Sequence, residues 1–153
     1  MITNLRELRQ DGQYIEEGMT TDDIWDKLGG VSRTVGVQWQ SKGQEFKLHN
    51  PNGLWAQVLP ERDAIAIDEA DDPSGQYTHL RVLNEDGSLR FEVPTAQSIK
   101  GGIRLGTFAW FETPRTGRQN CFAVMFVSLN DKTMYQLDID GASGQVVGVY
   151  PAQ

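Results

Sequence analysis

The feature that most constrains the fold is the stretch Cys121–Leu129, which is apolar at nearly every position. Such a run is typical of a central strand that is covered on both faces of a sheet. The segment before it, Ile103–Phe111, is also apolar on both faces. The segment after it, Tyr135–Ile139, alternates apolar and polar residues and is followed by Val146–Tyr150. The last third of the chain therefore predicts consecutive antiparallel strands.

The first thirty residues have a different period and predict two short helices. Thr3 can cap a helix that runs to about Gln10, because leucines follow it at helical spacing. A second helix is predicted from Thr20 or Thr21 to the pair Gly29-Gly30. The threonine hydroxyl can accept a free amide of the first turn, aspartates there suit the helix dipole, and the glycines end the helix.

From Val35 onward the period changes from that of a helix to the alternation of strands. Turn sequences separate the predicted strands, and Asp68–Gly75 is predicted to be a polar loop. The strands that precede the last third are Val35–Trp39, Phe46–Leu48, Leu54–Leu59, Ile65–Ile67, Tyr77–Leu83 and Ser88–Val93.

The predicted fold class is mainly β, with an α+β character. About ten short antiparallel strands form a curled sheet, a sandwich or a barrel, preceded by two short N-terminal helices. We expect a single domain over residues 1–153, in which the helical segment 1–30 packs on the antiparallel β-structure of residues 31–153. A chain of this length can bury a hydrophobic core without disulfides or metals.

Composition favours a soluble cytoplasmic protein. A single cysteine cannot form an internal disulfide, the N-terminus has no apolar signal run, and no stretch approaches the length of a membrane span. The net charge of −7 disfavours direct binding to nucleic acid and favours a basic partner. Acidity that serves only solubility explains the same charge equally well.

Catalytic and metal signatures are absent from the sequence. Two histidines and one cysteine are too few for a zinc cage, and Cys121 lies in the most apolar strand. Asp138 and Asp140 begin like a calcium loop without its distal glutamate, and they are predicted on a solvated strand face. We therefore expect no metal, no cofactor and no enzymatic activity. An enzyme that uses His79 or an unidentified carboxylate pair stays open as an alternative.

Protein binding is the better-supported class, and its candidate residues fall into three groups. Acidic residues gather at the start of the second helix and in the loop after Ile67, two tryptophans lie near strand ends, and a basic loop spans Thr113–Gln119. The candidates are Asp22, Asp23, Asp26, Asp68, Glu69, Asp71, Asp72, Trp55, Trp110, Arg115 and Arg118.

The hairpin Leu80–Pro94, with its Asn84-Glu85-Asp86-Gly87 turn, resembles segments of small bacterial immunity proteins of toxin–immunity pairs. The resemblance implies a cytoplasmic protein that binds and neutralises a cognate toxin, a basic nuclease being one such toxin. It assigns no inhibitory residue. The alternative is a β-barrel or sandwich that binds a small molecule in a cavity lined by Trp39, Phe108 and Trp110.

Overall fold

Strands make up most of the chain in the computed structural model, which describes residues 1–152. The elements, in chain order, are β1 (Thr3–Arg9), β2 (Tyr14–Glu16), α1 (Thr21–Leu28), β3 (Thr34–Ser41), β4 (Gln44–His49), β5 (Leu54–Val58), β6 (Ala64–Ala70), β7 (Thr78–Asn84), β8 (Leu89–Val93), β9 (Ala96–Ile99), β10 (Gly102–Glu112), β11 (Cys121–Ser128), β12 (Met134–Asp140) and β13 (Val146–Pro151).

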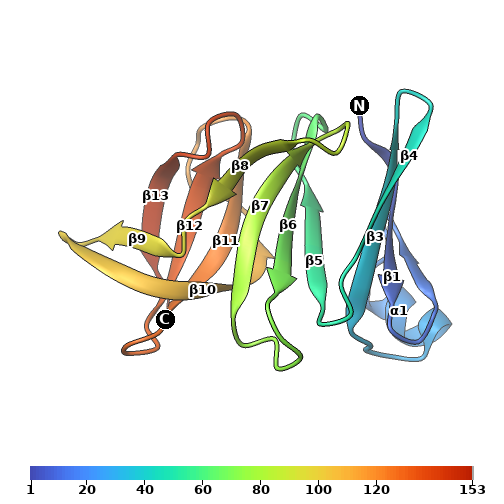
Figure 1. Cartoon of the computed structure of the whole chain (residues 1–153), viewed down its shortest axis with the longest axis horizontal. Coiled ribbons are helices and arrows are strands. Elements are labelled where there is room, and N and C mark those ends of the chain that lie inside the picture. Colours follow the sequence, from blue (N-terminus) through green and yellow to red (C-terminus); the bar gives the residue numbers. More distant parts are fainter. Residues whose placement is uncertain (153) are drawn as a thin grey trace.

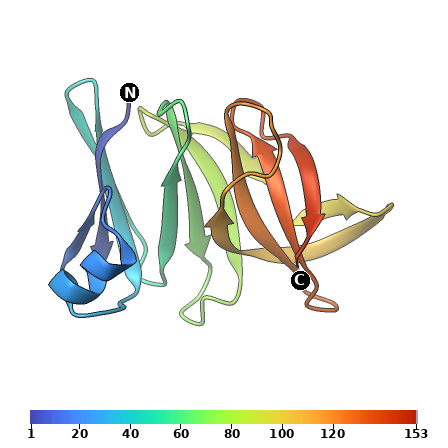
Figure 2. The same cartoon turned by 180° about the vertical axis from the view of Figure 1, so that it is seen from behind.

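The strands form three antiparallel sheets that lie one behind another along the long axis (Figure 1). The N-terminal sheet has the order β2-β1-β3-β4, the middle sheet β5-β6-β7-β8, and the C-terminal sheet β13-β12-β11-β10-β9. Helix α1 lies beside the N-terminal sheet, and the tip of the β9–β10 hairpin lies at the opposite end of the molecule (Figures 1 and 2).

Strand β6 is buried on both faces and belongs to two hydrophobic cores. Ala64 and Ala66 face the C-terminal sheet, whose phenylalanines fill the first core. Ile65 and Ile67 face the N-terminal sheet, where the second core includes Trp39. Successive residues of a strand point to opposite faces, so one strand supplies both cores. The middle sheet is thus the central one of three layers.

Strand β11 is the central strand of its own sheet and is buried along nearly its whole length, as its sequence predicted. One face packs into the first core. The other face, with Ala123 and Met125, is also buried. The segment between β10 and β11 is tied to this sheet because the backbone amides of Arg115 and Thr116 both donate to Asp138 Oδ2 at 2.7 Å.

The prediction of two N-terminal helices and about ten strands is wrong. The described residues contain 13 strands and only one α-helix. Thr3–Arg9, predicted as a helix, is strand β1 and pairs with β2 and β3 on its two sides. Its local helix propensity is overridden by this pairing. Glu7 lies opposite the core residue Val37, and Arg9 is buried. Because these inward positions are polar, the sequence of β1 lacks the apolar–polar alternation that predicts a strand.

The one helix lies where the capping pattern predicted it. Thr20 and Asp23 form a reciprocal capping box, and Gly29 ends the helix in the left-handed conformation. The buried Arg9 guanidinium donates to the Gly30 carbonyl at 2.7 Å and pairs with Asp11 at 2.7 Å. The helix end is therefore fixed to β1 by a charge-assisted contact.

Thr78 joins the middle sheet to the C-terminal sheet where β7 meets β10. Its hydroxyl donates to the Phe108 carbonyl at 2.9 Å and accepts from the Phe108 amide at 3.1 Å. Its own amide donates to the Thr107 hydroxyl at 2.9 Å. All these groups are buried, so each hydrogen bond replaces one that water would otherwise make.

Replacement of the Thr78 hydroxyl tests whether it stabilises the junction between the middle and C-terminal sheets. Thr78→Val keeps the shape but leaves the Phe108 amide and carbonyl unpaired, so we expect the free energy of unfolding to fall by about 1–3 kcal/mol. Urea denaturation measures it, with Thr95→Val at an exposed position as the control, for which a change within about 0.5 kcal/mol is expected. Equal stability of the two variants would contradict the role of Thr78.

Candidate protein-binding site

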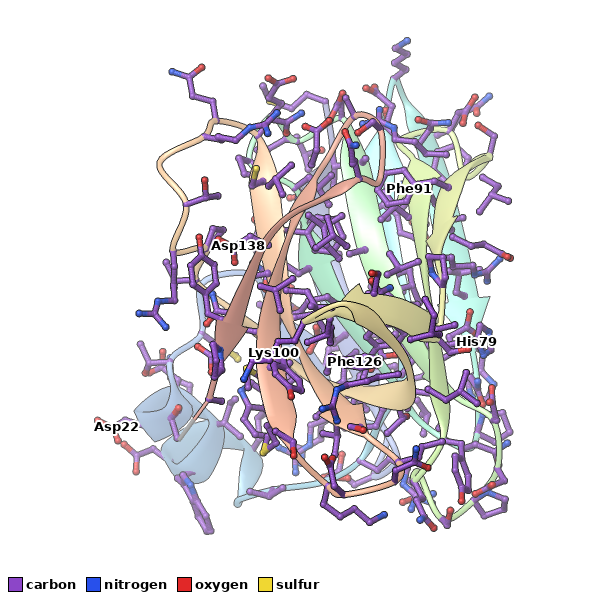
Figure 3. All side chains as sticks on the ribbon, turned by 90° about the vertical axis from the view of Figure 1, so that its left-hand side faces the viewer. Asp22, His79, Phe91, Lys100, Phe126 and Asp138 are labelled. Atoms are coloured by element: carbon purple, nitrogen blue, oxygen red, sulfur yellow. The ribbon has the colours of Figure 1, made fainter. Side chains whose placement is uncertain are left out.

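The β9–β10 hairpin projects from the end of the molecule and carries exposed apolar side chains. Strand β10 pairs with β9 as far as Leu105 and with β11 from Gly106 onward. A Cβ on Gly106 would lie 2.3 Å from the Phe126 ring, so the position at which β10 changes partner from β9 to β11 requires glycine. Beyond it, Ile103 is 72% exposed and Leu105 is 57% exposed. Figure 3 looks onto this end, with Lys100 of the hairpin turn in the centre.

Two adjoining hollows lie at the base of the hairpin. One, of about 550 Å³, is lined by His79 and Glu92 together with the segment that enters β9. The other, of about 280 Å³, is lined by Asp71, Tyr77 and Leu105, among others. Thr95 lines both hollows. We call Tyr77, Ile103 and Leu105, with the flanking acids Asp71 and Glu92, the hairpin surface.

A short chain of polar contacts connects the two hollows. His79 Nδ1 lies 2.5 Å from Asp71 Oδ1, and its Nε2 lies 3.9 Å from Glu69. Glu69 is held more closely by Arg81, at 2.9 Å. Within residues 1–152, no group of three or more histidine, cysteine or acidic side chains is arranged to hold a metal ion.

The acidic segment that begins at Asp68 is split by the fold. Asp68 and Glu69 belong to strand β6 rather than to a loop, and they point to opposite faces of the middle sheet. Only Asp71 and Asp72 lie in the β6–β7 connection, where Asp72 accepts from the Ser74 amide. The prediction of a loop from Asp68 is wrong because β6 continues through two carboxylate positions.

Asp68 is 1% exposed, and neither carboxyl oxygen has a hydrogen-bond partner among the described residues. Burial raises its pKa to about 8. The Thr78 hydroxyl opposes the rise, whereas the negative charges of Asp71 and Glu69 add to it. That hydroxyl is already engaged by the Phe108 backbone. Asp68 is therefore a neutral core residue at moderate pH and is removed from any contact surface.

The acids of helix α1 are far from the hairpin. Asp23 is used in the capping box, and Asp22 and Asp26 are exposed. Figure 3 shows Asp22 and His79 on opposite sides of the molecule. The fold does not bring the predicted acidic groups into one surface.

The predicted basic loop lies on the outer face of the C-terminal sheet. Arg115 stacks over the Tyr150 ring at 4.8 Å, and Arg118 is exposed. The buried Asp138 beneath the loop corrects the prediction that this residue is solvated. The strand pattern alone could not show that the loop folds back over its own sheet.

The predicted ligand cavity lined by Trp39, Phe108 and Trp110 is not formed. Trp39 belongs to the second core and Phe108 to the first, so they cannot line one space. Trp110 is 47% exposed and donates to Glu112, whereas Trp55 is 37% exposed on β5. No described helix is long and apolar enough to cross a membrane.

The exposure of Ile103 and Leu105 was not predicted, because an apolar strand pattern predicts burial. The available signal was the Lys100-Gly101-Gly102 turn just before them, which marks a hairpin tip. Glu7 was not among the predicted candidate residues either, although burial raises its pKa to about 7. Glu7 lines a hollow between β1, β2 and α1.

Comparison with known proteins gives one informative match. A chain of the solved structure of Tne2 in complex with Tni2 is 30% identical, with a TM-score of 0.94, and the alignment covers 100% of both chains. This chain belongs to the same family as that component of the complex. No protein-family profile matches, and no curated protein does. The family therefore includes a protein that is found in a two-protein complex.

The buried carboxyl predicts a pH dependence of stability. The folded pKa of Asp68, about 8 against 3.8 ordinarily, means that the folded chain holds an extra proton between these values. Stability should therefore fall as pH rises, by about 1.4 kcal/mol per unit. Asp68→Asn removes this contribution. Its free energy of unfolding should match the native value near pH 4 and exceed it by at least about 2 kcal/mol at pH 8.

Chemical denaturation across this range measures both proteins, and the contribution of Glu7 cancels in their difference. A difference that stays constant with pH would contradict a neutral, buried Asp68.

The loop between β10 and β11 should limit the rate at which the Cys121 thiol reacts. This thiol is buried, and burial raises its pKa. Asp138→Ala frees the Arg115 and Thr116 amides, so the loop should open and a thiol reagent should react about ten times faster. Asp131→Ala, which breaks an ion pair with Arg104, is the control and should react at the native rate. Equal rates for both variants would refute the covering role of the loop.

Proposed function

We propose that this chain is an immunity protein that binds and neutralises a cognate bacterial toxin, as the counterpart of Tni2. The observation that carries the proposal is the full-length match to a component of the Tne2–Tni2 complex. Two features of the chain support a role in binding. Apolar side chains are exposed on a projecting hairpin, and the buried polar groups Thr78, Arg9 and Asp138 serve the fold.

The charge of the chain supports a basic toxin. A net charge of −7 produces a negative field that speeds encounter with a positive surface and disfavours nucleic acids as direct partners. Neutralisation then follows from occupation of the toxin surface, in the cytoplasm of the producing cell. This mechanism requires no cofactor and no catalysis by the chain.

Binding to the product of the adjoining gene tests the proposal, since immunity proteins are encoded beside their toxins. The purified proteins should form a 1:1 complex, and co-expression of the chain should restore growth to cells that make the toxin. Affinity should fall about tenfold or more between roughly 0.05 and 0.5 M salt because ionic screening shortens the reach of the negative field.

The matched control is an immunity protein of another toxin at equal concentration, which should neither bind nor protect. Absence of a complex at low salt, together with no protection of growth, would refute the proposed function.

A further inference from the structure

We infer that the hairpin surface is the docking site for the toxin, and that it receives a toxin segment in which a lysine or arginine lies beside apolar residues. The inference rests on the proposed function and deepens it by locating the contact. It starts from Ile103 and Leu105, which are 72% and 57% exposed. Large apolar side chains on a projecting strand are typical of a surface that a partner covers.

The hairpin presents these residues on one face. Ile103 lies opposite Ser98 and Leu105 opposite Ala96, so the four side chains share a face. The other face of the hairpin is occupied: Ile99 belongs to the first core, and Arg104 lies over the Tyr135 ring. The hairpin is thus held by one face and free on the other, as a docking element requires.

The apolar face continues into the hollows at its base. Leu105 and Tyr77 line the smaller hollow, and Tyr77 is 43% exposed. An aromatic ring beside aliphatic groups provides the kind of contact that dominates binding energy at protein interfaces. A partner that covers Ile103 and Leu105 would therefore also reach the hollow.

The charge of the hollows decides the chemistry of the occupant. Asp71 lines the smaller hollow and Glu92 lines the larger one, and both side chains are exposed. Asp71 is bonded to His79, which positions it between the two spaces. A cationic side chain that enters either hollow meets a carboxylate, whereas an anionic one is repelled. The complementary partner is therefore basic at this point and apolar beside it.

Paired substitutions test the inference, with the toxin encoded by the adjoining gene as the probe. The double variant Ile103→Asp/Leu105→Asp should raise the Kd at least about 100-fold, because it removes apolar contacts from the centre of the site. Val31→Asp is the matched control. Val31 is 84% exposed and lies three residues beyond the last residue of helix α1, which is at the other end of the molecule (Figure 1). Its Kd should stay within about twofold of the native value.

Charge reversal tests the second element. Glu92→Lys should lower the association rate about tenfold and weaken its salt dependence, whereas Glu61→Lys, also at an exposed position, should have a smaller effect. Thermal unfolding of every variant should match the native protein, because each changed side chain is exposed.

The two proposals fail differently. If the native chain does not bind the toxin, the proposed function is wrong. If the native chain binds but the hairpin variants bind equally well, or Val31→Asp abolishes binding, the function stands and the docking site is wrong. A hairpin that mediates self-association would overturn the inference as well, and sedimentation of the native chain and the double variant without toxin would reveal it.

Discussion

Double burial of strand β6 is the constraint on which the rest of the structure depends. Its alanines, Ala64 and Ala66, leave room for the phenylalanines of the C-terminal sheet, and its isoleucines fill the space beneath Trp39. Close packing leaves little tolerance for a change of volume on either face. Because both cores share this strand, the N-terminal and C-terminal sheets are positioned relative to each other through it. The isolated carboxyl of Asp68 in this strand makes the stability of the arrangement sensitive to pH.

The proposed docking site lies at the margin of this scaffold, where strand β10 changes its pairing partner. Strand β10 pairs with β11 from Gly106 onward, whereas its first part, up to Leu105, pairs with β9. Thr78 and Thr107 fix the point of departure by buried hydrogen bonds. The projecting part of the hairpin is therefore fixed at its base while its side chains are exposed. Fixing the base lowers the entropic cost of binding a partner.

The sequence predicted those parts of the fold in which local pattern and environment agree. The apolar run of β11 and the capped helix α1 lie where they were expected. Strand β1 was missed because its inward positions include Glu7 and Arg9, and the contact that stabilises the buried Arg9 is supplied only by the folded chain. The candidate site was predicted least well. Asp71 is common to the predicted residues and to the hairpin surface, but Asp68 is buried. Exposure of Ile103 and Leu105 depends on where the pairing of β10 with β11 ends, which no local pattern reveals.

Hydrogen–deuterium exchange of the chain with and without the toxin tests the central claim most directly. In the free chain β9 is an edge strand with exposed residues, so amides of the hairpin should exchange early. Addition of the toxin should slow exchange in residues 96–105 and in the connection from Asp71 to Tyr77, and leave helix α1 unchanged. Protection confined to α1, to the N-terminal sheet or to the loop after Glu112 would contradict the account.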